Sequence, residues 1–342
     1  MNTYVPTKLT VEKEMEVCLL ILSILENDIK KVDNGELLML TERYIDLLLS
    51  IDIPIIKSRL CVFFQSYLDY FNRKKGDNSI QYETNTKIIH SLFNYLMYYK
   101  ETPGLSYQAA HSLTSLIRYK IYSNIVGDVS KQILPDLIKI IGEVQILLFF
   151  DVLNNIVLYL DVEDKVMLIC KELTQRILTE IKSPLADLNE GHYNSYTNKC
   201  FNILLSIVEK YKFFLDERTD SPSLVIFEQT INPLMLYLKN PTKIFFDDDL
   251  IVLLTILIKN VEVISAYMGE IFPVLTKYLK KHLGINKHLY NLLLAYLQYS
   301  GDFFNTQNNL VILTQIIEYG LSQYDELEES GPYAALDRKS VV

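Results

Sequence analysis

The sequence predicts an all-α protein, a HEAT- or armadillo-like helical-repeat solenoid in which helix pairs form an α–α superhelix. Apolar residues recur at helical spacing in segments of about 15 to 22 residues. Clusters of turn-forming residues separate these segments. Almost no segment alternates apolar and polar residues as a strand does. Glycine is scarce, at 11 of 342 residues, and folds built on tight turns usually contain more of it.

The separating clusters are rich in Gly, Pro, Asn, Asp and Ser. They lie at 33–36, 50–54, 72–79, 100–104, 123–128, 160–164, 183–194, 216–223, 239–249, 282–287 and 299–307. About fifteen helices fit between them. Grouped in pairs, the helices repeat about every 40 to 47 residues, the spacing of HEAT or armadillo repeats.

A single helix of such a pair cannot bury its wide apolar face, so stacked pairs share one continuous core. We therefore expect residues 1–324 to form a continuous solenoid of about seven pairs. Residues 325–342 should form an acidic C-terminal end that is truncated or disordered, because "SGPYAALDRKSVV" departs from the repeat pattern.

The most HEAT-like stretch is "SIDIPIIKSRLCVFFQSYLDYF". Asp52 falls in the expected turn between two helices. Pro54 opens the second helix, where its missing N–H costs nothing. Lys57 and Arg59 follow in the first turns of that helix. They are close enough to pair with Asp52 or with its equivalent in a neighbouring repeat.

Three prolines interrupt otherwise regular apolar helices, namely Pro135, Pro233 and Pro273. A proline inside a helix removes one backbone donor and crowds a carbonyl of the preceding turn. In the paired scheme all three fall in the first helix of a pair. We expect these helices on the outer, convex layer, each bending near its proline, because a bend there leaves the packed face intact.

The charge balance limits the partners. The net charge is −9 and the pI is about 5.2, which argues against direct nucleic-acid binding because phosphate neutralisation needs a basic surface. The same charge permits a basic protein as partner.

No signal peptide is recognisable at the N-terminus. No charge-free apolar run is long enough for a membrane span. The best candidate run is broken by Asp151, Asn154 and Asn155.

The cysteines and histidines show no metal or redox pattern. Cys18, Cys61, Cys170 and Cys200 form no CxxC pair, so we expect small buried hydrophobes in a reducing compartment. The five histidines are scattered at His90, His111, His192, His282 and His288.

Motifs for phosphate loops, dinucleotide sites, zinc hydrolases, serine hydrolases and calcium loops are missing. We therefore expect no catalytic residue, no cofactor, no bound metal and no enzyme activity.

Two acidic stretches are the candidate partner-binding residues. Asp247, Asp248 and Asp249 stand at an expected helix start, and Asp325, Glu326, Glu328 and Glu329 follow near the C-terminus. The first group also suits helix capping and the helix dipole, and the second suits a solvated face. The alternative is that both meet a basic partner on an acidic concave surface.

Taken together, the helices resemble importin-beta-type nuclear transport receptors (karyopherins), nearest to the importin-seven, importin-eight and Cse-one-like branch. The resemblance covers roughly residues 10 to 325 and rests on the order and pattern of five segments. These are Asp52–Phe71, Tyr99–Ile117, Ile133–Ile181, Cys200–Tyr211 and Phe245–Leu279.

The resemblance implies a receptor that wraps protein cargo for import into the nucleus under control of the Ran GTPase. It also implies contact with nucleoporins and shuttling between cytoplasm and nucleus. The family's N-terminal Ran-binding repeats are not recognisable here. The chain is therefore expected to be a divergent or truncated member, or one piece of a split receptor.

Two other readings stay open. The chain could serve as a generic HEAT scaffold or adaptor subunit of a multiprotein complex. An all-helical enzyme is disfavoured by the missing motifs. It would need convergent titratable groups in one deep pocket.

Overall fold

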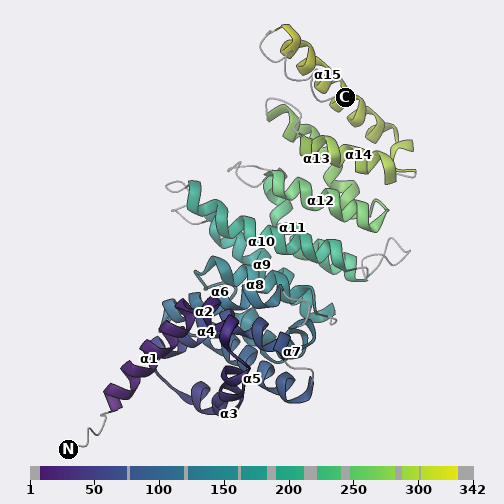
Figure 1. Ribbon diagram of the computed structural model, residues 1–342. Coiled ribbons are helices and arrows are strands. Elements are labelled where there is room, and N and C mark those ends of the chain that lie inside the picture. Colours follow the sequence, from purple (N-terminus) through teal and green to yellow (C-terminus); the bar gives the residue numbers. More distant parts are fainter. Residues whose placement is uncertain are drawn as a thin grey trace, which may run out of the picture. The chain divides into compact units, whose positions relative to one another are not determined.

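The computed structural model describes residues 8–74, 78–118, 122–160, 163–182, 190–211, 222–239, 247–281, 287–299 and 302–329. Within these ranges the chain forms helices and no strand, which confirms the predicted all-α helical-repeat fold (Figure 1). The helices are α1 (Lys8–Ile24), α2 (Glu26–Val32), α3 (Glu36–Ser50), α4 (Pro54–Lys74), α5 (Asn78–Leu96), α6 (Pro103–Ile117), α7 (Ser123–Ile140), α8 (Leu147–Val157), α9 (Glu163–Lys182), α10 (Glu190–Lys210), α11 (Pro222–Lys239), α12 (Asp247–Val261), α13 (Ala266–Lys281), α14 (Lys287–Tyr299), the 3₁₀ turn η4 (Phe303–Asn305) and α15 (Gln307–Glu329).

The chain divides into two compact units, Met1–Val162 and Glu163–Val342. In the first unit, α3, α5 and α7 stack as one layer and α4, α6 and α8 as a second, with α1 packed on α4. In the second unit, α9, α11, α13 and α15 form one layer and α10, α12 and α14 the other. From α3 to α8 and from α9 to α15, each helix thus packs on the next helix but one within its unit, as stacked pairs require.

The two layers of each unit differ in how tightly they pack. Second helices of successive pairs, such as α4 with α6 and α12 with α14, pack extensively. First helices, such as α3 with α5 and α11 with α13, touch over less of their length, although α9 and α11 pack closely. More open packing is expected of the layer on the convex side of a curved stack.

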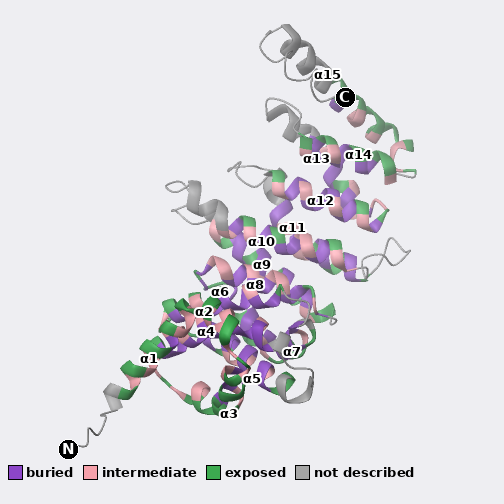
Figure 2. Ribbon diagram, in the orientation of Figure 1, coloured by how far each residue is buried: buried purple, intermediate pink, exposed green. Residues whose placement is uncertain are grey.

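The core of each unit lies between its layers (Figure 2). Phe63, Tyr67 and Phe71 form a ladder of ring contacts along α4, with centroids 5.0 to 6.2 Å apart. The buried Tyr67 hydroxyl donates to the Leu22 carbonyl of α1 at 2.6 Å. The Tyr67 ring therefore enters the core with its hydroxyl satisfied by the backbone of the neighbouring helix.

The predicted pairing of Asp52 is confirmed. Lys57 Nζ lies 2.6 Å from Asp52 Oδ1, and the Tyr95 and Tyr98 rings stand 5.4 and 4.9 Å from the ammonium. Lys57 is buried while Asp52 is exposed. The hydrogen bond and the positive charge of Lys57 lower the pKa of Asp52. A lysine can be buried here because a carboxylate and two aromatic faces replace water.

The prediction for Pro54 also holds, whereas Arg59 was expected to pair with Asp52 or its equivalent and instead pairs with Glu16. Pro54 is the first residue of α4. Arg59 reaches the adjacent helix α1, where its Nη2 lies 3.5 Å from Glu16 Oε1. The basic residues of this turn therefore pair both within their own repeat and with the neighbouring helix.

Pro135, Pro233 and Pro273 lie inside α7, α11 and α13. All three helices belong to the first-helix layer of their unit. Pro135 is exposed, and Pro233 and Pro273 are half-buried. The expected position in the pair is confirmed, whereas the bend and the convex placement stay predictions.

One cysteine departs from expectation. Cys61, Cys170 and Cys200 are buried, but Cys18 is exposed. The expectation that all four are buried was wrong because α1 is covered on one side only, and Cys18 does not share the side of Leu19, which is buried.

The close approach of Gly269 on α13 to Phe303 yields a test of the packing. A Cβ added at Gly269 would lie 3.1 Å from Phe303 Cε2, and this ring also contacts Phe272, Tyr296 and Phe304. We expect Gly269→Ala to destabilise the second unit by about 1–3 kcal/mol through overpacking, measured as a lower thermal midpoint by circular dichroism.

The matched control is Gly127, inside α7. A Cβ there would meet Tyr159 Cβ at an ordinary 3.8 Å. Gly127→Ala should therefore stabilise its helix by about 0.5–1 kcal/mol. If both variants gain stability, the packing described around Phe303 is wrong.

Candidate functional site

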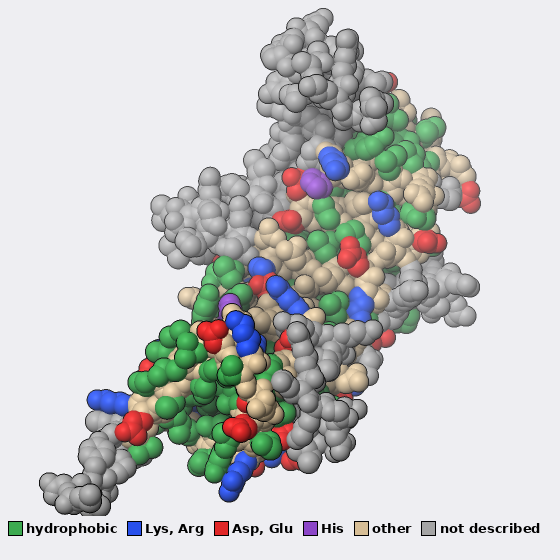
Figure 3. Space-filling view, in the orientation of Figure 1, with side chains coloured by type: hydrophobic (Ala, Val, Ile, Leu, Met, Phe, Trp, Pro, Cys, Tyr) green, Lys and Arg blue, Asp and Glu red, His purple; other side chains and the backbone are tan. Residues whose placement is uncertain are grey.

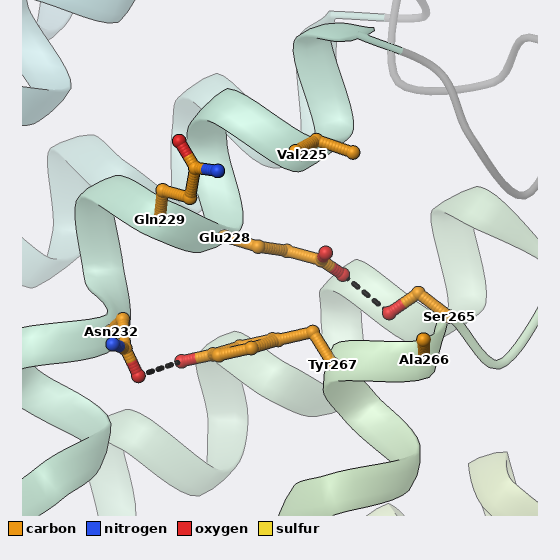
Figure 4. Close-up of a pocket in the computed structure, with 7 residues that line it drawn as sticks. All are labelled: Val225, Glu228, Gln229, Asn232, Ser265, Ala266 and Tyr267. Atoms are coloured by element: carbon orange, nitrogen blue, oxygen red, sulfur yellow. Dashed lines mark hydrogen bonds between the residues drawn. The ribbon is translucent and has the colours of Figure 1, made fainter.

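A groove with a buried carboxyl lies between α11 and α13 and is a candidate site of the second unit (Figure 4). Its cavity measures about 290 Å³. The lining residues come from one face of α11 and from the first turn of α13. They are Val225, Glu228, Gln229, Asn232, Ser265, Ala266 and Tyr267.

Glu228 is placed by the amphipathic pattern of α11. Leu224, Phe227 and Ile231 are buried on one side of this helix. Glu228 lies four residues after Leu224 and three residues before Ile231. Its side chain therefore extends from the edge of the apolar face toward α13 (Figure 4). Only 5% of Glu228 is exposed.

Ser265 joins the two helices. It is the residue before α13, and its Oγ accepts the backbone N–H of Met268 at 3.1 Å, the bond of a helix N-cap. The same hydroxyl donates to Glu228 Oε1 at 2.5 Å. One carboxylate oxygen of Glu228 is thus held by the capping residue of the next first helix.

Tyr267 forms the opposite wall. Its hydroxyl donates to Asn232 Oδ1 at 3.2 Å, and Figure 4 shows the ring extending from α13 back toward α11. The turn that carries Tyr267 is also held by α14, because the Tyr296 hydroxyl donates to the Met268 carbonyl at 2.7 Å. The wall is therefore fixed at both ends.

Burial raises the pKa of the Glu228 carboxyl, and the hydrogen bond from Ser265 opposes this only in part. Burial also raises the pKa of Tyr267, with a further contribution from the charge of Glu228. No basic side chain lines the groove among the residues described there. Among the described residues, the groove therefore offers hydrogen-bond acceptors and one buried carboxyl that none of them pairs with a positive charge.

The first unit has grooves in its own first-helix layer. One of about 300 Å³ runs between α3, α5 and α7 and includes Asp46, Lys87 and His90. Lys87 Nζ lies 3.0 Å from Asp46 Oδ1 there. In the adjoining groove of about 390 Å³, Tyr82 donates to Asp128 Oδ2 at 3.0 Å. These carboxylates already have partners within the chain.

The predicted acidic residues are only partly described. Asp247 begins α12, as expected, but its side chain lies outside the described residues. Asp248 is exposed and Asp249 is half-buried. Burial and the charge of Asp248 raise the pKa of Asp249, while His288 of α14 opposes the shift.

The second acidic group falls at the end of α15. Its backbone is helical through Glu329, but the side chains of Asp325, Glu326, Glu328 and Glu329 lie outside the described residues. A role for either acidic group in partner binding stays a prediction.

Among the side chains that are described, no group of three or more His, Cys, Asp or Glu could hold a metal ion. His111 Nδ1 faces Gln65 Oε1 at 3.0 Å, whereas the side chains of His192 and His282 lie outside the described part of the chain. No described helix is long and apolar enough to cross a membrane.

Apolar side chains are exposed at the end of the first unit formed by α1 and α3 (Figure 3). On α3 the buried Leu38, Thr41 and Ile45 face α5, while the opposite side is also apolar. The exposed apolar side chains of the two helices are Val11, Val17, Ile21, Ile24, Met39, Leu40, Tyr44 and Leu47. Terminal helices of a repeat stack usually carry a polar outer face, so this end differs from an ordinary cap.

Sequence reasoning missed Glu228 as a site residue. The available signal was an acidic residue in register with the apolar stripe of "SLVIFEQTINPL". Its contact with Ser265 spans 37 residues, and the sequence alone gives no indication of that distance.

No protein-family model, curated protein or solved structure matches this chain. The fold defines the class, an all-α helical-repeat protein, and the resemblance to karyopherins stays a proposal.

Substituting Glu228 tests the burial of its carboxyl. Below the ordinary Glu pKa of 4.5 the Glu228 carboxyl is protonated in both the folded and the unfolded chain. The stability of the Glu228→Gln variant should therefore match that of the parent. Above this pKa, the unfolded chain ionises first because burial raises the folded pKa. The parent therefore loses stability as pH rises through the folded pKa, and the variant does not.

The measurement is thermal unfolding of both proteins between about pH 4 and 8, the range in which a raised carboxyl pKa acts. The thermal midpoint of the variant should rise relative to the parent with pH. The exposed Glu270 of α13 supplies the control, because Glu270→Gln removes a charge without changing a buried group. An equal gain in both variants would contradict the burial argument.

Proposed function

We propose that the chain is a non-enzymatic, protein-binding helical-repeat scaffold whose partners present basic segments. The observation that carries the proposal is the set of grooves between first helices, described in both units and lined by carboxylates. Carboxylates in such grooves can attract the positive side chains of a partner. The net charge of −9 adds a long-range attraction for positive chains.

The exposed apolar side chains of α1 and α3 give this proposal further support, since exposed apolar patches mark protein contacts. Enzyme chemistry has no comparable support. It would need a nucleophile, a metal cluster or a phosphate loop, and the sequence offers no motif for any of them.

Within this class we propose an importin-like nuclear transport receptor, or a fragment of one, that binds protein cargo and shuttles between cytoplasm and nucleus. The support is the order of helical segments that resembles karyopherins, together with the acidic surface charge. Ran GTPase and nucleoporins are the partners that this proposal adds. A generic HEAT scaffold or adaptor subunit is the alternative.

Binding to Ran distinguishes the importin-like receptor from the generic scaffold or adaptor. If the chain is a Ran-regulated receptor, immobilised full-length protein should retain purified Ran loaded with GTP more strongly than Ran loaded with GDP. Equal retention of both forms, or of neither, would reject the Ran-regulated receptor and leave the adaptor.

The acidic start of α12 has its own test. Replacing Asp247, Asp248 and Asp249 together by Asn should weaken binding of a basic cargo peptide, because three negative charges are lost. The salt dependence should flatten as well, since screening acts on these charges over a Debye length of about 10 Å at 0.1 M and about 3 Å at 1 M.

Asn still caps a helix, so the thermal midpoint should change little. Fluorescence anisotropy of a lysine-rich peptide over a salt series provides the measurement. Unchanged affinity and unchanged salt dependence would remove these residues from the contact surface.

A further inference from the structure

The groove between α11 and α13 combines a buried carboxyl with hydrogen-bond acceptors, and no described lining residue supplies a positive charge. Glu228 is 5% exposed, and one of its oxygens is occupied by Ser265 at 2.5 Å. The groove contains no basic residue among those that line it. The grooves of the first unit differ, because Lys87 pairs with Asp46 in one of them and Lys131 lines the other together with Asp128.

A buried carboxylate is stable only when paired or hydrogen-bonded. Here a cavity of about 290 Å³ adjoins the carboxylate. That volume is at the small end for ligand pockets, which span roughly 300–1,000 Å³, and it suits one side chain better than a whole small molecule. Ser265 bonds one oxygen of this carboxylate, and a single positive side chain of another protein can pair with the other.

We propose that the α11–α13 groove is a lysine pocket, in which the ammonium group of a partner's lysine pairs with Glu228. This inference rests on the proposed protein-binding function and names the chemistry that one site recognises. The pocket lies in the first-helix layer, whereas Asp247–Asp249 begin α12 in the second-helix layer.

The geometry favours lysine over arginine. A guanidinium pairs best with both oxygens of a carboxylate, and Ser265 already holds Oε1. An ammonium group donates up to three hydrogen bonds, each to one acceptor atom. The second oxygen of Glu228 is such an acceptor, whereas Asn232 and the Tyr267 hydroxyl lie at the other end of the groove (Figure 4).

The rim suits the rest of the side chain. Val225 and Ala266 line the groove and are exposed, and the Tyr267 ring forms its wall (Figure 4). The four methylenes of lysine can pack on such apolar surface while the ammonium reaches the carboxylate. The chemical shifts of the Val225 and Ala266 methyl groups should therefore report whether a side chain occupies the groove.

The test uses the full chain with labelled Val and Ala methyl groups and Nα-acetyl-lysine N-methylamide as the probe. Saturable chemical-shift changes should appear at Val225 and Ala266, with a dissociation constant on the order of millimolar, as expected for a single side chain. The norleucine analogue, which has the stem without the charge, should produce no saturable change.

Glu228→Gln should weaken lysine binding at least about tenfold, a change of about 1.4 kcal/mol. Glu270→Gln, on the same helix as Tyr267 but exposed, should bind as the parent does. Ser265→Ala gives a second variant that keeps the buried carboxyl but removes the hydrogen bond that holds its Oε1, and it should also change lysine binding.

Each remaining outcome decides against the proposal. Tighter binding of the arginine analogue would show that the groove prefers a guanidinium group to an ammonium group. Equal binding by norleucine, or no shift at any probe concentration, would show that the groove is an internal space closed to cations. Because the probe needs neither Ran nor cargo, this failure is distinguishable from failure of the proposed transport function.

Discussion

The whole architecture depends on one constraint, that a single helix pair cannot bury its apolar side chains without the next pair. Phe63, Tyr67 and Phe71 show the consequence, since their rings fill the space along α4 and one hydroxyl bonds the backbone of α1. A charged group enters such an interface at low cost only with a partner. Lys57 does so because Asp52 and two tyrosine rings replace water around its ammonium.

The same constraint explains where grooves form. Close packing of second helices, such as α12 on α14, leaves the first helices of neighbouring pairs less closely packed. That layer tolerates Pro135, Pro233 and Pro273, whose missing donors fall on exposed or half-buried positions. The cavities lie in the same layer. Side chains of α11 and α13 line a groove between the two helices instead of interdigitating.

Features local in sequence were predictable, and features that depend on register between helices were not. The helical period predicted the helix pairs, and Asp52 and Lys57 are only five residues apart. The burial of Cys18 was predicted wrongly, because it depends on what covers α1. Glu228 and Ser265 meet across 37 residues, so only the stacking of α11 on α13 reveals their contact.

Glu228 couples stability to recognition. An apolar residue at its position would avoid the cost of burying a carboxyl, and the raised pKa of Glu228 reflects that cost. A cation entering the groove would reverse the balance, because a nearby positive charge favours the ionised form and lowers the pKa. Binding would then release a proton whenever the empty groove holds the neutral acid. The destabilising charge and the selectivity for an ammonium group therefore have the same physical origin, a carboxylate placed where water cannot solvate it fully.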